Sequence, residues 1–173
     1  RAMTSAASLS GAAQAGFKEG DAIILLGETS GGLGGSEYLA AIHGLERGAP
    51  PSLDLDLEKR VQAACREAVQ AGLVSSAHDT SDGGLAVALA ESCLSGPDLV
   101  GARVDLPNPG GARADEVLFG EAASRIILSV PEGKIAEVEA AARRHEVPIA
   151  RIGKVGGEKL EISAAGQGLV SEA

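Results

Sequence analysis

Aromatic residues are nearly absent from this sequence, which has no Trp, one Tyr (Tyr38) and two Phe (Phe17 and Phe119) in 173 residues. The hydrophobic core must therefore be built from Ala, Val, Leu and Ile. Cations are also scarce, because 15 Lys+Arg against 24 Asp+Glu give a formal net charge of −9. Nucleic-acid binding relies on Lys and Arg at phosphates and on aromatic rings under bases. Both shortages argue against that function.

Long apolar runs are missing too. No segment approaches the roughly 18 apolar residues that indicate a membrane span, and the N-terminal stretch lacks the apolar core of a secretory signal. The two cysteines, Cys65 and Cys93, form neither a disulfide framework nor a zinc-binding spacing. We therefore expect a soluble protein of the reducing cytoplasm, with no membrane partner.

The length suits one domain, which would bury about 70% of its unfolded surface. The chain opens Arg1-Ala2-Met3 and continues with Ala, Ser and Gly, which predicts a flexible linker over residues 1–16 of a piece from a longer polypeptide. We expect the folded domain over 17–163 and a polar, frayed tail over 164–173.

Apolar runs bounded by turn residues predict strands that alternate with helices. The expected strands are 21–27, 75–80, 100–106, 125–130, 149–155 and 158–163. The expected helices are 36–43, 83–94, 112–119, 131–145 and one from a cap at Asp54 or Asp56 to about 71. The pair Gly156-Gly157 between the last two strands predicts a β-hairpin. This order indicates an α/β domain with a mixed β-sheet flanked by helices.

A glycine-rich loop, residues 27–36 (GETSGGLGGS), lies between the first predicted strand and helix. Glycines let backbone N–H groups approach a ligand closely, as in a phosphate cradle. The stretch is neither a Walker A loop nor a G-x-G-x-x-G motif. A structural turn at the domain edge explains it equally well. The candidate nucleotide-binding residues here are Gly31, Gly32, Gly34 and Gly35.

An acidic loop, residues 77–85 (AHDTSDGGL), lies between the third predicted helix and the strand before it. Asp79 and Asp82 repel a bare phosphate, so an anion would bind only through a divalent cation. Mg²⁺ takes one or two carboxylates together with phosphate oxygens and water. Ser81 can hydrogen-bond a phosphate or a metal-bound water. Alternatively, Ser81 or Asp82 can cap the following helix.

Two further residues of this region have titratable side chains. An unperturbed His titrates near about pH 6.5, but His78 has no visible nucleophile partner, which favours a structural role. Glu121, after Leu118-Phe119-Gly120, is either a third site ligand or a solvated loop charge. No complete catalytic constellation is recognisable, so no catalytic residue is assigned.

Taken together, these motifs resemble a known family. The segments are GDAIILLGE at 20–28, LGGSEY at 33–38, HDTSDGGL at 78–85 and LFGE at 118–121. They resemble the C-terminal domain of the large subunit in the phosphoribosylformylglycinamidine synthase (FGAM synthase) family, part of the AIR synthase-related superfamily. The resemblance extends from about residue 20 to 163, and HDTSDGGL is its most specific part.

The resemblance implies a domain of an ATP- and glutamine-dependent ligase of purine biosynthesis. That enzyme has two similar halves, and this chain would belong to the auxiliary half, where an ATP or ADP site with Mg²⁺ has a structural role. Asp79 would coordinate Mg²⁺ and Ser81 would touch the nucleotide. The implied partners are the preceding domains of the same polypeptide and the glutaminase subunit.

One departure from the family pattern concerns Glu121-Ala122-Ala123, which stands where the active half has Glu-Ser-Gln in contact with substrate. The missing polar side chains imply a non-catalytic role, and we expect the isolated chain to be inactive.

Two alternative functions stay open. In the first, the chain derives from AIR synthetase, selenophosphate synthetase or thiamine-phosphate kinase; in the second, it is a packing module without a ligand.

Overall fold

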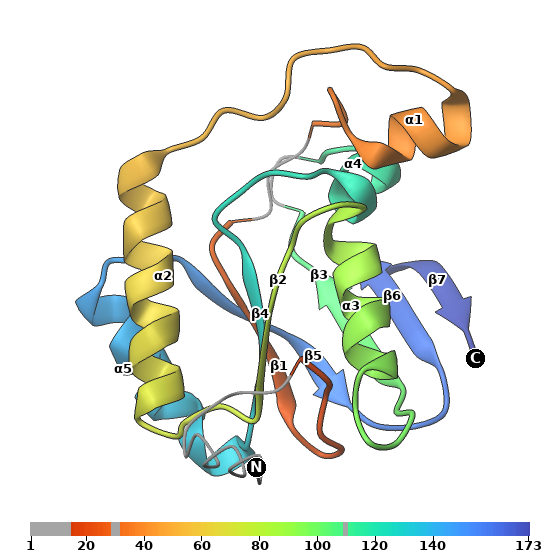
Figure 1. Cartoon of the computed structure of the whole chain (residues 1–173). Coiled ribbons are helices and arrows are strands. Elements are labelled where there is room, and N and C mark those ends of the chain that lie inside the picture. Colours follow the sequence, from red (N-terminus) through yellow and green to blue (C-terminus); the bar gives the residue numbers. More distant parts are fainter. Residues whose placement is uncertain (1–14, 29–31, 109–110) are drawn as a thin grey trace, which may run out of the picture.

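The computed structural model describes residues 15–28, 32–108 and 111–173, which form one seven-stranded sheet with helices on both faces (Figure 1). The strand order is β2-β4-β1-β5-β3-β6-β7. The strands are β1 (Ala22–Leu26), β2 (Ser76–Asp79), β3 (Ala102–Leu106), β4 (Ile126–Val130), β5 (Ile149–Val155), β6 (Leu160–Ala164) and β7 (Gln167–Glu172). The helices are α1 (Glu37–His43), α2 (Leu55–Gln70), α3 (Gly84–Leu94), α4 (Ala114–Phe119), α5 (Ile135–Arg144) and the 3-10 turn η1 (Glu132–Lys134).

The predicted mixed α/β sheet is confirmed. β3 and β6 pair in parallel, whereas β1 pairs antiparallel with both β4 and β5. The predicted order of helices and strands also matches as far as β6.

The predicted hairpin between 149–155 and 158–163 is wrong. β3 lies between β5 and β6, and Gly156 and Gly157 form a connection that crosses the end of β3. There the Gly101 N–H donates to the Gly157 carbonyl and the Gly156 N–H donates to the Gly101 carbonyl, at 2.9 and 2.8 Å. A pair of glycines supplies a turn, but it does not decide which strands become neighbours.

The expected frayed tail over 164–173 is also corrected, because most of it is strand β7. β6 and β7 form a hairpin in which Ala164 pairs with Gln167. The two residues between them, Ala165 and Gly166, both have positive φ, 49° and 78°. That backbone is typical of a tight two-residue hairpin. The strand was hidden in the sequence because β7 lies at the sheet edge and is mostly exposed, so its residues are largely polar.

β1 lies at the centre of the sheet, and its five side chains are all buried. Ile23 and Leu25 pack into the core beneath α3 and α4, and Ile24 and Leu26 into the core beneath α2 and α5. Each such side chain contributes roughly 1.5–3 kcal/mol when fully buried. The unbroken apolar run of β1 therefore reflects a strand that is covered on both faces.

Within the described ranges, no helix has the length and apolar character needed to cross a bilayer.

α2 and α5 pack side by side on one face and are joined by charged side chains (Figure 1). Glu67 on α2 accepts hydrogen bonds from Arg144 and His145 at the end of α5. The Arg144 hydrogen bond, and then that of His145, lowers the pKa of Glu67 below its ordinary value of 4.5.

This shift predicts a pH-dependent contribution to stability. Because the folded state lowers the pKa of Glu67, its contribution is complete above the unfolded pKa and is lost as pH falls through the folded pKa. Glu67→Gln should therefore lower the urea midpoint at pH 7, and the difference from wild type should narrow below pH 4.5. Glu139→Gln, which removes an exposed pair with Arg143, is the control and should have a smaller effect. A Glu67→Gln effect that stays constant from pH 7 to pH 3 would contradict this account.

Gly27, just after β1, allows a close chain crossing. Its φ is +92°, and an added Cβ would lie 2.0 Å from the Ser124 carbonyl oxygen. Gly20 has a similar φ of +88°, but an added Cβ there would have no neighbouring atom within 4 Å.

We expect Gly27→Ala to destabilise the fold more than Gly20→Ala does. Both substitutions carry a left-handed backbone cost of about 1–2 kcal/mol, and the clash at Gly27 should add about 1–3 kcal/mol. Urea unfolding of the two variants measures the difference. Equal losses at the two positions would show that Ser124 can move away at no cost.

Candidate functional site

Both loops singled out in the sequence leave the same edge of the sheet. β4 runs between β1 and β2, and its first residue, Ile126, pairs with Leu26 on one side and with Asp79 on the other. The glycine-rich loop follows Leu26, and the acidic loop begins at Asp79. The turn that leads into β4 therefore enters between the two loops (Figure 1).

The glycine-rich loop is described at residues 27–28 and 32–36, and Gly31 lies outside the described residues. It ends at Ser36, the N-cap of α1. The Ser36 Oγ accepts from the Leu39 N–H at 3.3 Å and donates to the Leu33 carbonyl at 2.7 Å. The predicted helix start at residue 36 thus has a side-chain cap.

Gly34 and Gly35 are packed against the segment that follows α1. An added Cβ at Gly34 would lie 2.1 Å from the Ala49 carbonyl oxygen. The Gly35 N–H donates to the Arg47 carbonyl at 3.1 Å. Chain packing therefore explains both glycines. Gly32 has more space, because an added Cβ there would lie 3.8 Å from its nearest neighbour, the Pro51 Cγ.

The acidic loop presents three side chains to solvent: Asp79, Ser81 and Asp82. None of them makes a hydrogen bond or ion pair with another described residue. The expected capping of the helix by Ser81 or Asp82 is wrong. The N-cap of α3 is Gly83, whose left-handed backbone (φ 77°) carries no side-chain cap. All three polar side chains are thus left available to a ligand.

Glu121 fills the capping role instead. Its Oε1 accepts the Gly83 N–H at 2.8 Å and the Glu37 N–H at 2.9 Å. Glu37 is the first residue of α1, and Gly83 immediately precedes α3. One carboxylate oxygen therefore joins the ends of the two loops. The carboxylate is therefore not a solvated loop charge, and only the LFGE segment marked the residue in the sequence.

Arg125 fixes the turn that carries Glu121. Its side chain is only 2% exposed, and it donates from Nε to the Ala122 carbonyl and from Nη2 to the Gly120 carbonyl, at 2.9 and 2.5 Å. Burial lowers the pKa of Arg125 to about 10, opposed by the nearby charge of Glu121. The guanidinium therefore stays protonated at neutral pH. Its Nη1 is buried without a partner among the described residues.

α3 is held tightly against this turn. At Gly84, an added Cβ would lie 2.7 Å from the Gly120 carbonyl oxygen and 2.9 Å from that of Leu118. The buried Thr80 donates its N–H and its Oγ1 to the Arg125 carbonyl, at 3.1 and 3.3 Å. The acidic loop is therefore anchored at Thr80 and at Gly84, with the exposed Ser81 and Asp82 between these anchors and Asp79 just before the first.

His78 and the cysteines have structural surroundings. The His78 Nδ1 lies 2.7 Å from the Asp79 carbonyl oxygen, and its Nε2 lies 3.3 Å from the Glu91 carboxylate on α3. Burial raises the pKa of Cys93 to about 11 and also raises that of Cys65. High thiol pKa values are unfavourable for a nucleophile at neutral pH.

The described residues do not form an all-protein metal cage, because they contain no group of three or more His, Cys, Asp or Glu suited to hold a metal. Asp79 and Asp82 can supply one or two carboxylates. That donor set fits Mg²⁺ completed by phosphate oxygens and water.

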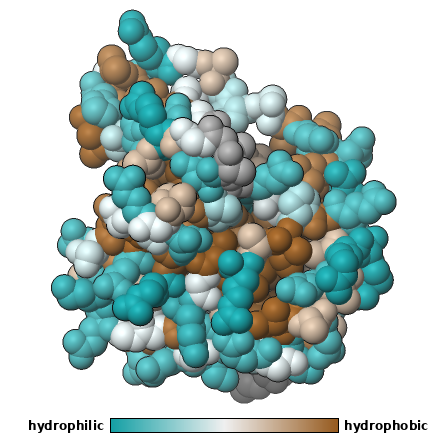
Figure 2. Space-filling model, turned by 180° about the vertical axis from the view of Figure 1, so that it is seen from behind, coloured by the Kyte–Doolittle hydropathy of each residue, from teal (hydrophilic) through white to brown (hydrophobic). Residues whose placement is uncertain are grey.

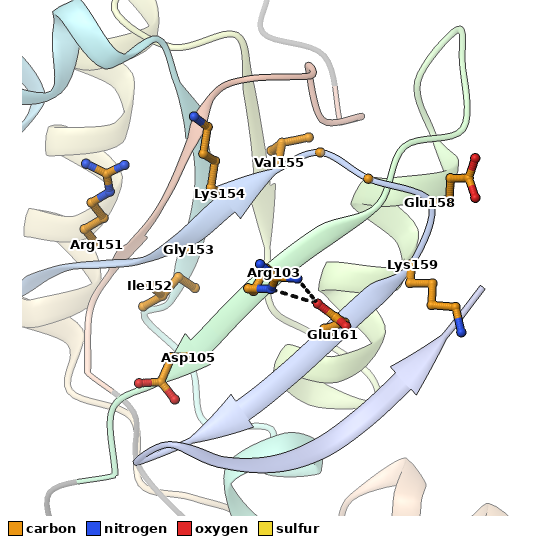
Figure 3. A pocket seen from close by; sticks show the side chains of 12 residues that line it. Arg103, Asp105, Arg151, Ile152, Gly153, Lys154, Val155, Glu158, Lys159 and Glu161 are labelled. Carbon is orange, nitrogen blue, oxygen red and sulfur yellow. Dashed lines mark hydrogen bonds and ion pairs between the residues drawn. The ribbon is translucent and has the colours of Figure 1, made fainter.

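A further cavity lies away from these loops. It has a volume of about 920 Å³ and opens on the outer face of β5, β3 and β6 (Figure 3). Several of its charges are already paired, as Arg103 is with Glu161 and Arg151 with Glu132. None of its lining residues is a candidate site residue from the sequence.

Comparison with known proteins links this geometry to a family. The family model of the AIR synthase related protein, C-terminal domain, matches residues 18–164. Phosphoribosylformylglycinamidine synthase subunit PurL of Anaeromyxobacter sp. is 52% identical over 154 residues, which cover 84% of this chain and 20% of that protein. The chain thus spans about a fifth of the length of this relative.

Solved structures share the fold. Thermotoga maritima PurL complexed with FGAR has a TM-score of 0.75 at 22% identity, over 92% of this chain and 28% of that one. Thiamine-monophosphate kinase of Stenotrophomonas maltophilia has a TM-score of 0.56 at 20% identity, over 92% and 55% of the two chains. The family model covers nearly all of the described sheet, from β1 to β6. The chain therefore belongs to the family of AIR synthase related protein C-terminal domains.

Proposed function

We propose that the chain serves as the C-terminal, auxiliary-half domain of phosphoribosylformylglycinamidine synthase, the ATP- and glutamine-dependent ligase of purine biosynthesis. The observation that carries this proposal is the 52% identity to a PurL subunit over 84% of the chain. The thiamine-monophosphate kinase shares the fold at only 20% identity, which gives that alternative weaker support.

We further propose that the acidic loop and the glycine-rich loop hold a nucleotide with Mg²⁺. Asp79 would bind the ion and Ser81 a phosphate, because both side chains are exposed and make no bond to a described residue. Gly32 and Gly34 would offer N–H groups, whereas Gly35 would shape the loop, since its N–H is engaged. Thermotoga maritima PurL has been solved with ADP, AMPPCP and ATP, which supports a nucleotide as the ligand. The bound Mg²⁺ would neutralise phosphate charge next to the carboxylates.

The remaining domains of the longer polypeptide and a glutaminase subunit are the partners we propose. Large exposed apolar side chains support a covered surface, and four of them lie between residues 42 and 55: Ile42, Leu45, Leu53 and Leu55. Apolar surface also gathers across the middle of the face shown in Figure 2. Thermotoga maritima PurL occurs in a PurLQS assembly. We place the full-length protein in the cytoplasm, and we infer that the isolated chain has no ligase activity.

A packing module without a ligand is the second candidate. It is favoured by one observation, namely that packing against residues 47–50 already accounts for Gly34 and Gly35. The two candidates differ in whether the acidic loop contributes to nucleotide affinity.

Asp79→Asn in the full-length protein tests the ligand. If Asp79 holds Mg²⁺, the substitution should weaken MgADP binding at this site by on the order of 10–100-fold, as measured by calorimetry. Asp98→Asn is the matched control, because Asp98 is an exposed carboxylate beyond the opposite end of α3. Equal affinities for wild type and Asp79→Asn would favour the packing module.

A further inference from the structure

We propose that Glu121 is a positioning residue of this nucleotide site, acting as the link that makes the glycine-rich loop and the acidic loop one unit. This inference rests on the proposed function of the two loops. Glu121 would not touch the ligand. It would set the relative position of the two segments that do.

The link is made by a single atom. Glu121 Oε1 lies 2.9 Å from the Glu37 nitrogen and 2.8 Å from the Gly83 nitrogen. The Glu37 nitrogen directly follows the glycine-rich loop at the start of α1, and the Gly83 nitrogen lies near the end of the acidic loop, just before α3. Hydrogen bonds to an ionised acceptor are roughly twice as strong as neutral ones. A carboxylate is also favoured where helices present the positive ends of their dipoles.

α1 has few other attachments to the domain. Within this fully described helix no side chain is buried. The Tyr38 ring stacks on Phe119 with a centroid separation of 4.6 Å and an interplanar angle of 2°. Phe119 and Glu121 both belong to the end of α4 and the turn after it. The position of α1, and of the glycine-rich loop before it, therefore depends on this short segment.

Glu121 is itself held in place. Arg125 binds the carbonyl groups of Gly120 and Ala122, the residues on either side of Glu121. The guanidinium is buried and places a positive charge near the carboxylate. The backbone that carries Glu121 is thus fixed by contacts other than its two bonds to the loops. Neither loop can move away from the other without breaking a bond to Oε1.

The experiment compares Glu121→Ala and Glu121→Gln in the full-length protein with a matched control, Asp105→Ala. Asp105 is a fair match because its Oδ1 also accepts two hydrogen bonds, from Ser163 Oγ and the Gly166 N–H, at 2.6 and 3.1 Å. It joins β3 to the β6–β7 turn instead of the two loops. The readouts are hydrogen exchange of peptides covering 36–43 and 83–90 without ligand, MgADP affinity by calorimetry, and the thermal midpoint.

Glu121→Ala should speed exchange in both peptides together and weaken MgADP binding by on the order of tenfold. Glu121→Gln keeps an acceptor oxygen without the charge and should lie between Ala and wild type. Asp105→Ala should lower the thermal midpoint without changing the hydrogen-exchange rate of either peptide or the affinity for MgADP. This pattern would separate positioning from general destabilisation.

Faster exchange in only one peptide, or the same changes in Asp105→Ala, would overturn the role of Glu121. So would an unchanged affinity in Glu121→Ala alongside measurable binding to wild type. A wild-type protein that binds no MgADP would instead refute the proposed nucleotide site. Hydrogen exchange would still decide in that case whether Glu121 joins the loops.

Discussion

The carboxylate of Glu121, bonded through one oxygen to the starts of two helices, is the interaction on which the candidate site depends. Its position follows from the sheet. Ile126 at the start of β4 is flanked by the last residues of β1 and β2, so the turn before β4 lies between the two loops. A side chain on that turn can reach both loops at once. Glu121 does so, with two charge-assisted bonds to backbone N–H groups.

Close backbone approach makes this arrangement possible. Gly27 lets the glycine-rich loop pass the Ser124 carbonyl, and Gly84 lets α3 begin against the end of α4. A side chain at either glycine would separate segments that Glu121 must hold together. The buried Arg125 then stabilises the turn by bonding its carbonyl groups. The site is therefore built mainly from backbone contacts made by two charged side chains, Glu121 and Arg125.

Local patterns in the sequence were enough to predict most elements and both loops, because strands such as β1 and caps such as Ser36 are determined by neighbouring residues. Contacts distant in sequence were not predictable. The hairpin at Gly156-Gly157 was wrong because the insertion of β3 between β5 and β6 depends on residues about fifty positions earlier. The linking role of Glu121 was not predicted for the same reason, since its partners are backbone N–H groups, which leave no trace in residue type. Only its placement after LFG distinguished it.

The same reliance on backbone makes the framework independent of the side chains around it. Glu121 binds the N–H groups of residues 37 and 83, and Arg125 binds the carbonyl groups of residues 120 and 122. None of these four contacts uses a side chain of the partner residue. Ala122 and Ala123 can therefore stand where polar groups would serve chemistry, while the loops keep their relative position. The backbone contacts that join the two loops are therefore physically separable from side chains that would carry chemistry, as the proposed auxiliary nucleotide site would require.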